Sequence, residues 1–318
     1  MKSEYPIAES QDRFSTMTGT PALRTAGKMV EVKAGSLVEA NGHSYNIFVS
    51  GLEKRKLKEP VVIFESGMGV ELGNWKQVIA RVSEFAPVFA YDRAGIGKSE
   101  KVFEMPEPRI VAGNLHEILK VLNIDPPYLL VGHSLGGVYI RSFAGYYPRE
   151  VAGLAFLDPA DFTETRQDWN DIFRKLNISE QLIDDMLNRR LYQPTGKIDS
   201  LNYGAWSERR VLNELRKTDF DAIAGLPMPS VPVLFFVGGK FEVPLSQRSK
   251  EYDHEAFFHI KNSSNMERWR KLIHSTGKAG ALIYLSHAGH YIQFDDSISV
   301  VQQLRILHDR IKEEQPGN

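Results

Sequence analysis

Compact apolar runs alternate with longer amphipathic stretches along most of the chain. The apolar runs are short and rich in β-branched and aromatic residues, which favours strands, and they lie at residues 44–50, 61–65, 87–91, 128–131, 152–157, 231–237 and 281–285. The amphipathic stretches have helical spacing and lie near residues 74–84, 110–122, 136–147, 264–275 and 297–312. This alternation predicts an α/β fold, with a mostly parallel central sheet and helices on both of its faces.

The alternation lapses in one long region of the chain, between residues 159 and 230. Charged, helix-prone segments replace it there, around residues 168–176, 179–190 and 207–217. We predict that this region is a helical cap inserted into the α/β core. The expected organisation is therefore a polar N-terminal extension at residues 1–35, a core formed by residues 36–158 and 231–318, and a cap at residues 159–230.

Composition narrows the classes of partner. Hydrophobic residues make up 42% of the 318-residue chain, enough to bury a sizeable core. The 39 Lys and Arg nearly balance the 40 Asp and Glu, and no long block carries one sign, so we expect neither nucleic acid nor an anionic membrane as a partner. The absence of Cys excludes disulfides, thiolate metal sites and a Cys nucleophile. The expected partner is a small, weakly charged molecule, and nothing in the sequence indicates an oligomeric state.

The beginning of the chain gives an expectation about its location. Residues 1–28 are polar and rich in Ser, Thr and Pro. They contain no apolar stretch long enough for a secretion signal or a membrane span. We therefore expect a soluble protein, cytoplasmic as the sequence stands, with a secretion leader trimmed from its start as the alternative.

A candidate nucleophile lies between a predicted strand and a predicted helix. Residues 132–136 read Gly-His-Ser-Leu-Gly and match G-x-S-x-G, with Ser134 at the centre. Glycine is needed on both flanks because the serine occupies a strained turn in which larger side chains would collide with the strand and the helix. A serine hydroxyl is a weak nucleophile at neutral pH, so this interpretation requires a base elsewhere in the chain.

His290 is the candidate base, because it follows the last predicted strand, at residues 281–285. In this topology the triad histidine comes last in the chain, after the serine and the acid. His287 and His290 also have an H-x-x-H spacing that could bind a metal, but no third ligand cluster accompanies them, so we expect no metal site.

The oxyanion produced by attack on a carbonyl requires N–H donors. One donor is expected from the residue after the nucleophile, which is Leu135. The other is expected from the glycine-rich loop that follows the strand at residues 61–65, and there it is Met68. Both groups belong to the backbone, so their side chains are not constrained by this role.

Four segments in this order carry a resemblance to a known family: residues 65–69 (ESGMG), 91–99 (YDRAGIGKS), 132–137 (GHSLGG) and 289–291 (GHY). In them the chain resembles the α/β-hydrolase fold superfamily, from about residue 36 to residue 311. The resemblance implies a Ser-His-acid triad, no cofactor, and hydrolysis of an ester or similar bond through an acyl-enzyme on Ser134 with His290 as general base.

The acid departs from the commonest pattern of that superfamily. Most members carry it after the strand that follows the cap, at the end of a Gly-x-x-Asp stretch. This chain reads Gly238-Gly239-Lys240-Phe241-Glu242 there, so Phe241 stands where the Asp is expected when counted from Gly238, and Glu242 fits only when counted from Gly239. Some members carry it instead after the strand that follows the nucleophile helix, where this chain has Asp158. We favour Asp158, with Glu242 as the alternative.

The function expected from these residues is hydrolysis of a small or medium carboxylic ester. Two alternatives stay open. In the first, the same triad acts on a lactone, an amide or a carbon–carbon bond, or forms a peracid. In the second, the fold serves as a ligand-binding receptor and Ser134 turns over little or no substrate.

Overall fold

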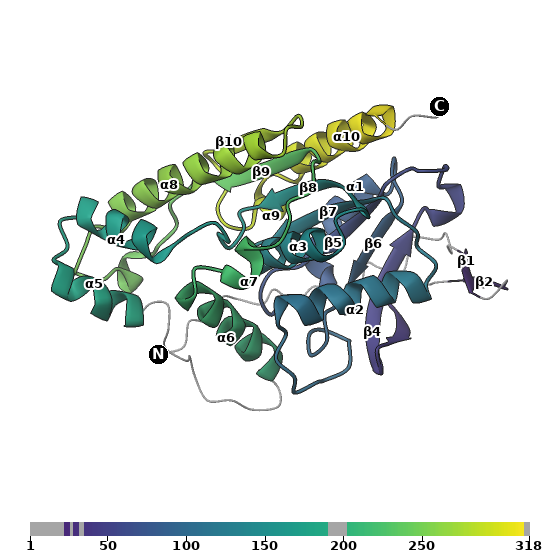
Figure 1. Ribbon diagram of the computed structural model, residues 1–318, viewed down its shortest axis with the longest axis horizontal. Coiled ribbons are helices and arrows are strands. Elements are labelled where there is room, and N and C mark those ends of the chain that lie inside the picture. Colours follow the sequence, from purple (N-terminus) through teal and green to yellow (C-terminus); the bar gives the residue numbers. More distant parts are fainter. Residues whose placement is uncertain (1–21, 26–27, 32–34, 190–201, 315–318) are drawn as a thin grey trace.

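The centre of the computed structural model, which describes residues 22–25, 28–31, 35–189 and 202–314, is an eight-stranded sheet (Figure 1). Its strand order is β10-β9-β8-β7-β5-β6-β4-β3. β4 pairs antiparallel with both β3 and β6, and the other neighbouring strands are parallel. The strands are β3 (Ser36–Ala40), β4 (His43–Ser50), β5 (Val61–Glu65), β6 (Val88–Tyr91), β7 (Tyr128–His133), β8 (Val151–Leu157), β9 (Val233–Gly238) and β10 (Ala281–Leu285).

The inner strands are apolar on both faces, as expected for a parallel sheet covered by helices. Every residue of β5, β7 and β9 is buried. One face is covered by α2 (Pro108–Val121), α3 (Leu135–Tyr146) and the C-terminal part of α8 (His254–Ser275). The other is covered by α1 (Lys76–Val82), α9 (Ile292–Asp295) and α10 (Ser297–Glu314). The predicted α/β-hydrolase architecture is confirmed.

A small antiparallel pair of strands precedes the sheet, formed by β1 (Ala22–Thr25) and β2 (Lys28–Glu31). It lies within the region predicted as a polar N-terminal extension, at residues 1–35. Most of the remaining extension lies outside the described residues. The sequence pattern gave no indication of this pair, because two four-residue strands are too short for a recognisable alternation.

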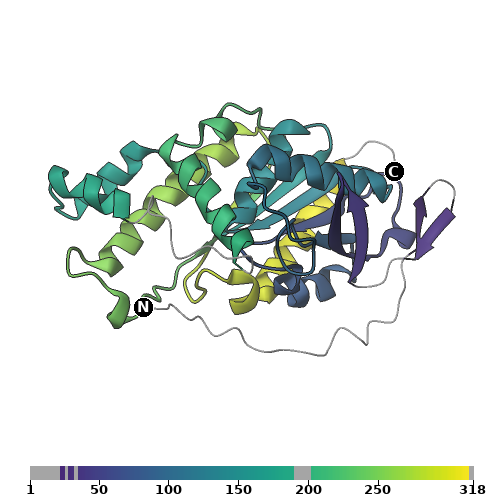
Figure 2. The same cartoon turned by 90° about the horizontal axis from the view of Figure 1, so that it is seen from below.

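In the part of the chain that the structure describes, four helices interrupt the core between β8 and β9: α4 (Arg166–Lys175), α5 (Glu180–Leu187), α6 (Tyr203–Lys217) and α7 (Asp221–Ala224). α4 and α5 form a small apolar core with the start of α8, in which Trp169, Phe173 and Phe257 stack. Figure 2 shows α4 and α5 at one end of the molecule, beyond the sheet. α6 and α7 instead contribute Val211 and Ile223 to the core on the α2–α3 side of the sheet. The insertion therefore consists of two separate parts.

α8 is longer than predicted. The sequence indicates a helix over residues 264–275, whereas the helix begins at His254, where the Asp253 carboxylate caps it by accepting the N–H groups of Glu255 and Ala256. Its first half packs on the insertion and its second half on the sheet. No described helix has the length and apolar character that crossing a bilayer requires.

Candidate active site

Ser134 lies on the sharp turn between β7 and α3 with φ 52° and ψ −119°, a conformation that side-chain-bearing residues rarely adopt. Two backbone hydrogen bonds hold this turn. The Ser134 N–H donates to the Leu157 carbonyl at 3.1 Å, and the Ser134 carbonyl accepts from the Ala160 N–H at 2.9 Å. Neighbouring β8 and its following loop thus hold the strained residue in place.

The two flanking glycines are required by close backbone contacts. A Cβ on Gly132 would lie 2.6 Å from the Gly136 carbonyl oxygen, and a Cβ on Gly136 would collide with the carbonyl oxygens of Glu65 and Ser66. The opposing atoms are backbone and cannot rotate away. The need for glycine at both positions that flank Ser134's tripeptide therefore has a direct steric cause in this chain.

These contacts give a stability prediction. Gly136→Ala is expected to lower the free energy of unfolding by about 1–3 kcal/mol or more, because the backbone of β5 must move to admit the methyl group. Gly113→Ala is the matched control: Gly113 lies inside α2 with nothing within 4 Å of the added Cβ, and this change is expected to stabilise by about 1 kcal/mol. Urea unfolding of both variants checks this; equal effects would contradict the steric account.

The structure brings Ser134, His290 and Asp158 together in one hydrogen-bonded chain. His290 Nε2 lies 3.1 Å from Ser134 Oγ, and His290 Nδ1 lies 2.7 Å from Asp158 Oδ2. The second Asp158 oxygen accepts the Gly238 N–H at 3.2 Å, which fixes the carboxylate plane. A base in hydrogen-bond contact with a serine, itself oriented by a carboxylate, can remove the hydroxyl proton during attack on a carbonyl.

Glu242, the alternative acid, is placed elsewhere. Its carboxylate pairs with Lys240 Nζ at 2.7 Å, and both side chains are about half exposed. It lies beside Gly289, the residue before His290, but His290 Nδ1 is hydrogen-bonded to Asp158. His287 is also directed away from the triad, with its Nε2 3.2 Å from Asp296 Oδ2. Among the described residues, no cluster of three or more His, Asp or Glu could hold a metal ion.

The two expected oxyanion donors lie on either side of the serine. Leu135 is the first residue of α3, where helix N–H groups have no acceptor within the helix. Met68 is in the loop after β5, and the preceding residue, Gly67, is so close that an added Cβ would lie 3.5 Å from the Ser134 Cβ. Both peptides therefore border the space in which a reacting carbonyl would lie.

His133, which the sequence analysis did not single out, is buried beneath the triad. Its Nε2 lies 2.9 Å from the His290 carbonyl oxygen and donates to it, since that oxygen can only accept. Burial, reinforced by the neighbouring His290, lowers the pKa of His133 to about 3. The ring is therefore neutral at physiological pH and holds the backbone of the histidine loop.

This buried imidazole gives a pH prediction. Between pH 6.5 and about 3 the unfolded chain binds a proton at His133 that the folded chain does not, so stability falls as the pH falls through this window. One such proton corresponds to about 1.4 kcal/mol per pH unit. In His133→Gln, which keeps an N–H donor, the decline in urea-unfolding free energy between pH 6 and pH 4 should be shallower by about that amount. Parallel curves for the two proteins would contradict the assignment.

A buried charge cluster lies under the Met68 loop and was also missed. Arg93 Nη1 pairs with Glu65 Oε1 at 2.6 Å and Arg93 Nε with Glu208 Oε1 at 2.7 Å, with all three side chains at most 3% exposed. Burial alone would lower the pKa of Arg93, but the two carboxylates raise it well above its ordinary value. Arg93 lies in residues 91–99, one of the four segments that carry the family resemblance. Nothing in the sequence around Glu208 marks it as the partner of Arg93.

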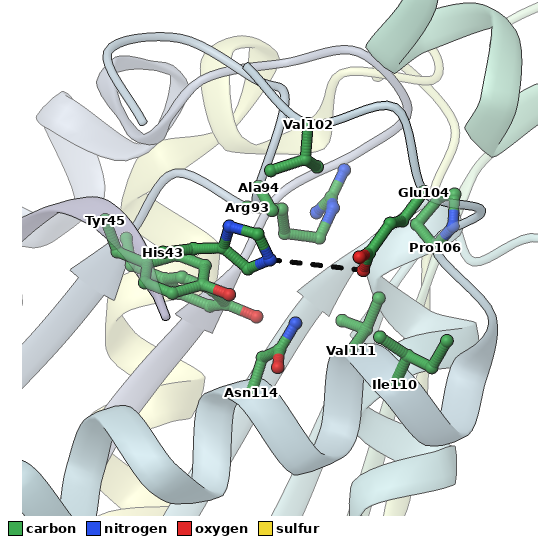
Figure 3. A pocket seen from close by; sticks show the side chains of 11 residues that line it. His43, Tyr45, Arg93, Ala94, Val102, Glu104, Pro106, Ile110, Val111 and Asn114 are labelled. Atoms are coloured by element: carbon green, nitrogen blue, oxygen red, sulfur yellow. Dashed lines mark ion pairs between the residues drawn. The ribbon is translucent and has the colours of Figure 1, made fainter. Parts of the chain in front are cut away.

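Arg93 also borders a small pocket, shown in Figure 3, which is lined by residues of β4, β6, the loop after β6 and α2. His43, Tyr45 and Glu104 line it, and His43 Nε2 lies 4.0 Å from Glu104 Oε2. Burial, with the nearby Glu104 and Glu100, raises the pKa of the Tyr45 hydroxyl to about 12. None of Ser134, Asp158 and His290 lines this pocket, so it is separate from the triad.

Comparisons with known proteins agree with this architecture. A family model described as the alpha/beta hydrolase fold matches residues 60–182. Uncharacterized protein YqjL of Bacillus subtilis (strain 168) is 35% identical over 99 residues, 31% of this chain and 39% of that protein. A 2-hydroxy-6-oxo-6-(2'-aminophenyl)hexa-2,4-dienoic acid hydrolase of Metapseudomonas resinovorans is 31% identical over 117 residues, 36% of this chain and 40% of that protein. The matches thus span less than half the length of these curated relatives.

A solved structure extends the likeness to nearly the whole fold. A thermophilic esterase from Thermogutta terrifontis superposes with a TM-score of 0.57 at 16% identity, covering 87% of this chain and 99% of that one. At this identity the likeness concerns the fold. The family match at residues 60–182, the sheet order and the turn at Ser134 together lead to one conclusion. The chain has the α/β-hydrolase fold.

Proposed function

We propose that this protein is a serine hydrolase that cleaves carboxylic esters through an acyl-enzyme on Ser134. The observation that carries the proposal is the continuous chain from Ser134 Oγ through His290 to Asp158, with distances of 3.1 and 2.7 Å. The strained backbone at Ser134 gives independent support, because it presents the hydroxyl above the carboxyl ends of the strands, where ligands of open α/β sheets bind.

Acylation follows from these positions. Ser134 Oγ attacks the ester carbonyl carbon while His290 Nε2 takes the hydroxyl proton, and Asp158 stabilises the resulting imidazolium. The negative charge that forms on the carbonyl oxygen is received by the Met68 and Leu135 N–H groups. Collapse of the tetrahedral intermediate breaks the bond to the alcohol oxygen, which takes the proton from His290.

Deacylation repeats the sequence with water as nucleophile. The His290 side chain is 47% exposed, so water can reach the imidazole that must activate it. Water gives a proton to His290 Nε2, its oxygen attacks the acyl carbon, and the proton then returns to Ser134 Oγ as the acid leaves. Apart from the ester and water, the proposed steps use side chains and backbone groups of this chain.

The insertion is proposed to act as a cap over this site. α6 supports this role, because Ala205 lies against the loop that contains Met68: a Cβ on Gly69 would be 2.7 Å from the Ala205 Cβ. The boundaries proposed for the cap remain residues 159–230, of which residues 190–201 lie outside the described part of the chain.

Hydrolysis of p-nitrophenyl esters of increasing acyl length tests the proposed reaction. Purified protein is expected to release p-nitrophenolate in multiple turnovers, with an optimum at one range of acyl lengths. Labelling by a fluorophosphonate should abolish that release in proportion to the fraction modified. Enzyme that is labelled but hydrolyses no ester would argue against ester specificity.

A second function with the same triad is favoured by one specific observation, the similarity to the dienoic acid hydrolase of Metapseudomonas resinovorans. A parallel panel of esters, lactones and 2-hydroxy-6-oxo-dienoic acids separates the two, since kcat/KM ranks the substrates. Saturable binding of a panel member without turnover would favour the receptor alternative.

A further inference from the structure

The peptide that presents the Met68 N–H is held from its opposite side. The Gly67 carbonyl oxygen, which belongs to the same peptide unit, accepts a hydrogen bond from Arg93 Nη2 at 2.7 Å. In a trans peptide the C=O and N–H bonds point in opposite directions. Fixing the Gly67 carbonyl therefore fixes the direction of the Met68 N–H. A charged donor on the carbonyl also polarises that N–H and makes it a stronger donor.

Arg93 itself has little freedom to move. Its guanidinium donates to Glu65, to Glu208 and to the Ser66 carbonyl, the last at 2.7 Å. It lies 5.0 Å from the centre of the Tyr139 ring, and the side chain is only 3% exposed. A planar group with this many fixed acceptors cannot rotate without leaving buried charges unpaired.

Glu208 connects this arrangement to the insertion. One of its oxygens holds Arg93, and the other accepts the N–H of Gly69, the residue after Met68, at 2.6 Å. Glu208 is 1% exposed and lies on α6, whose N-terminal Gly204 packs so closely on Gly95 that a side chain there would collide with the Gly95 carbonyl. Glu208 thus holds the residue after Met68 directly, and holds the residue before Met68 through Arg93.

We infer that Arg93 and Glu208 are the positioning residues of the oxyanion hole: together they set the direction of the Met68 N–H, and the hole is complete only when α6 of the insertion is seated. This inference rests on the proposed function. Neither side chain touches the reacting atoms. Their effect is expected in the stabilisation of the tetrahedral intermediate, and not in substrate binding or in proton transfer by His290.

The test compares Glu208→Gln and Arg93→Lys with the parent and with Glu164→Gln. Glu164 is a buried carboxylate of the insertion that pairs with Lys261 and has no contact with the Met68 loop, so it controls for loss of a buried ion pair. kcat is expected to fall about tenfold in Glu208→Gln and roughly a hundredfold in Arg93→Lys. KM and the pH profile should stay as in the parent, and the affinity for an alkylboronic acid, which forms a tetrahedral adduct, should fall with kcat.

Each outcome decides a separate claim. Parallel losses in kcat and boronic acid affinity, beyond those of Glu164→Gln, support the inference. A loss confined to KM or to the folded fraction, or no greater than in the control, overturns it. Glu208→Gln is the deciding variant if Arg93→Lys does not fold, because glutamine keeps an oxygen for the Gly69 N–H. A parent with no hydrolysis that depends on Ser134 overturns the proposed function, and this inference with it.

Discussion

Ser134→Ala is expected to reduce kcat for ester hydrolysis by about 10⁵- to 10⁶-fold. The alanine variant retains the turn, the two N–H donors and the His290–Asp158 pair, so only the attacking oxygen is lost. Steady-state rates on the best p-nitrophenyl ester measure the effect. Thermal unfolding should show that the folded state is kept.

The matched control is Ser142→Ala in α3, the helix that follows Ser134. Ser142 is fully buried, and its hydroxyl has no hydrogen-bond partner among the described residues. Its removal is expected to change kcat less than about twofold, because the residue touches neither the triad nor the Met68 loop. Hydrolysis that survives Ser134→Ala at the parental rate would contradict the nucleophile assignment.

Asp158→Asn is expected to lower kcat by about 10⁴-fold, with little change in KM. The asparagine amide can donate to His290 Nδ1, which would favour the tautomer whose proton is on Nε2 and leave no lone pair to accept the Ser134 proton. Glu242→Gln removes a half-exposed ion pair with Lys240 and should change kcat less than twofold.

The comparison of these two variants separates the acids directly. Both should be assayed at the same pH on the same ester, with circular dichroism to establish equal folding. A large loss in Glu242→Gln together with a small one in Asp158→Asn would show that Glu242 orients His290 during turnover. The placement of Asp158 at 2.7 Å from His290 Nδ1 would then describe a state other than the reactive one.

The sheet was predictable because its strands are buried on both faces. Runs such as residues 61–64 and 231–237 are apolar at every position and short, and they coincide with most of β5 and most of β9. The first half of α8 was not predicted, because that half faces the insertion whereas the second half faces the sheet. No single apolar stripe therefore runs along the helix.

The candidate site was predictable wherever the chemistry is local in sequence. Ser134 is marked by its flanking glycines and His290 by its position after the last strand. For the acid of the triad, the sequence leaves two candidates. Asp158 follows β8 and Glu242 follows β9, and these neighbouring strands end at the same edge of the sheet. Deciding between them requires side-chain positions, which strand order does not contain.

The charge cluster under the Met68 loop could not be predicted, since it joins distant segments. Arg93 and Glu208 are 115 residues apart, and α6, which carries Glu208, belongs to the insertion rather than to the alternating strands and helices of the core. Buried ionic groups are stable only when paired. Arg93 lies two residues after the end of β6, and the order of the sequence does not identify the carboxylates that pair with it.

Peptide mapping after reaction with a fluorophosphonate tests the central claim, that Ser134 is an activated nucleophile, most directly. The account predicts one adduct per chain on the peptide containing Ser134, no adduct in Ser134→Ala, and much slower labelling in Asp158→Asn. An unlabelled parent, or an adduct on a different residue that persists in Ser134→Ala, would contradict it.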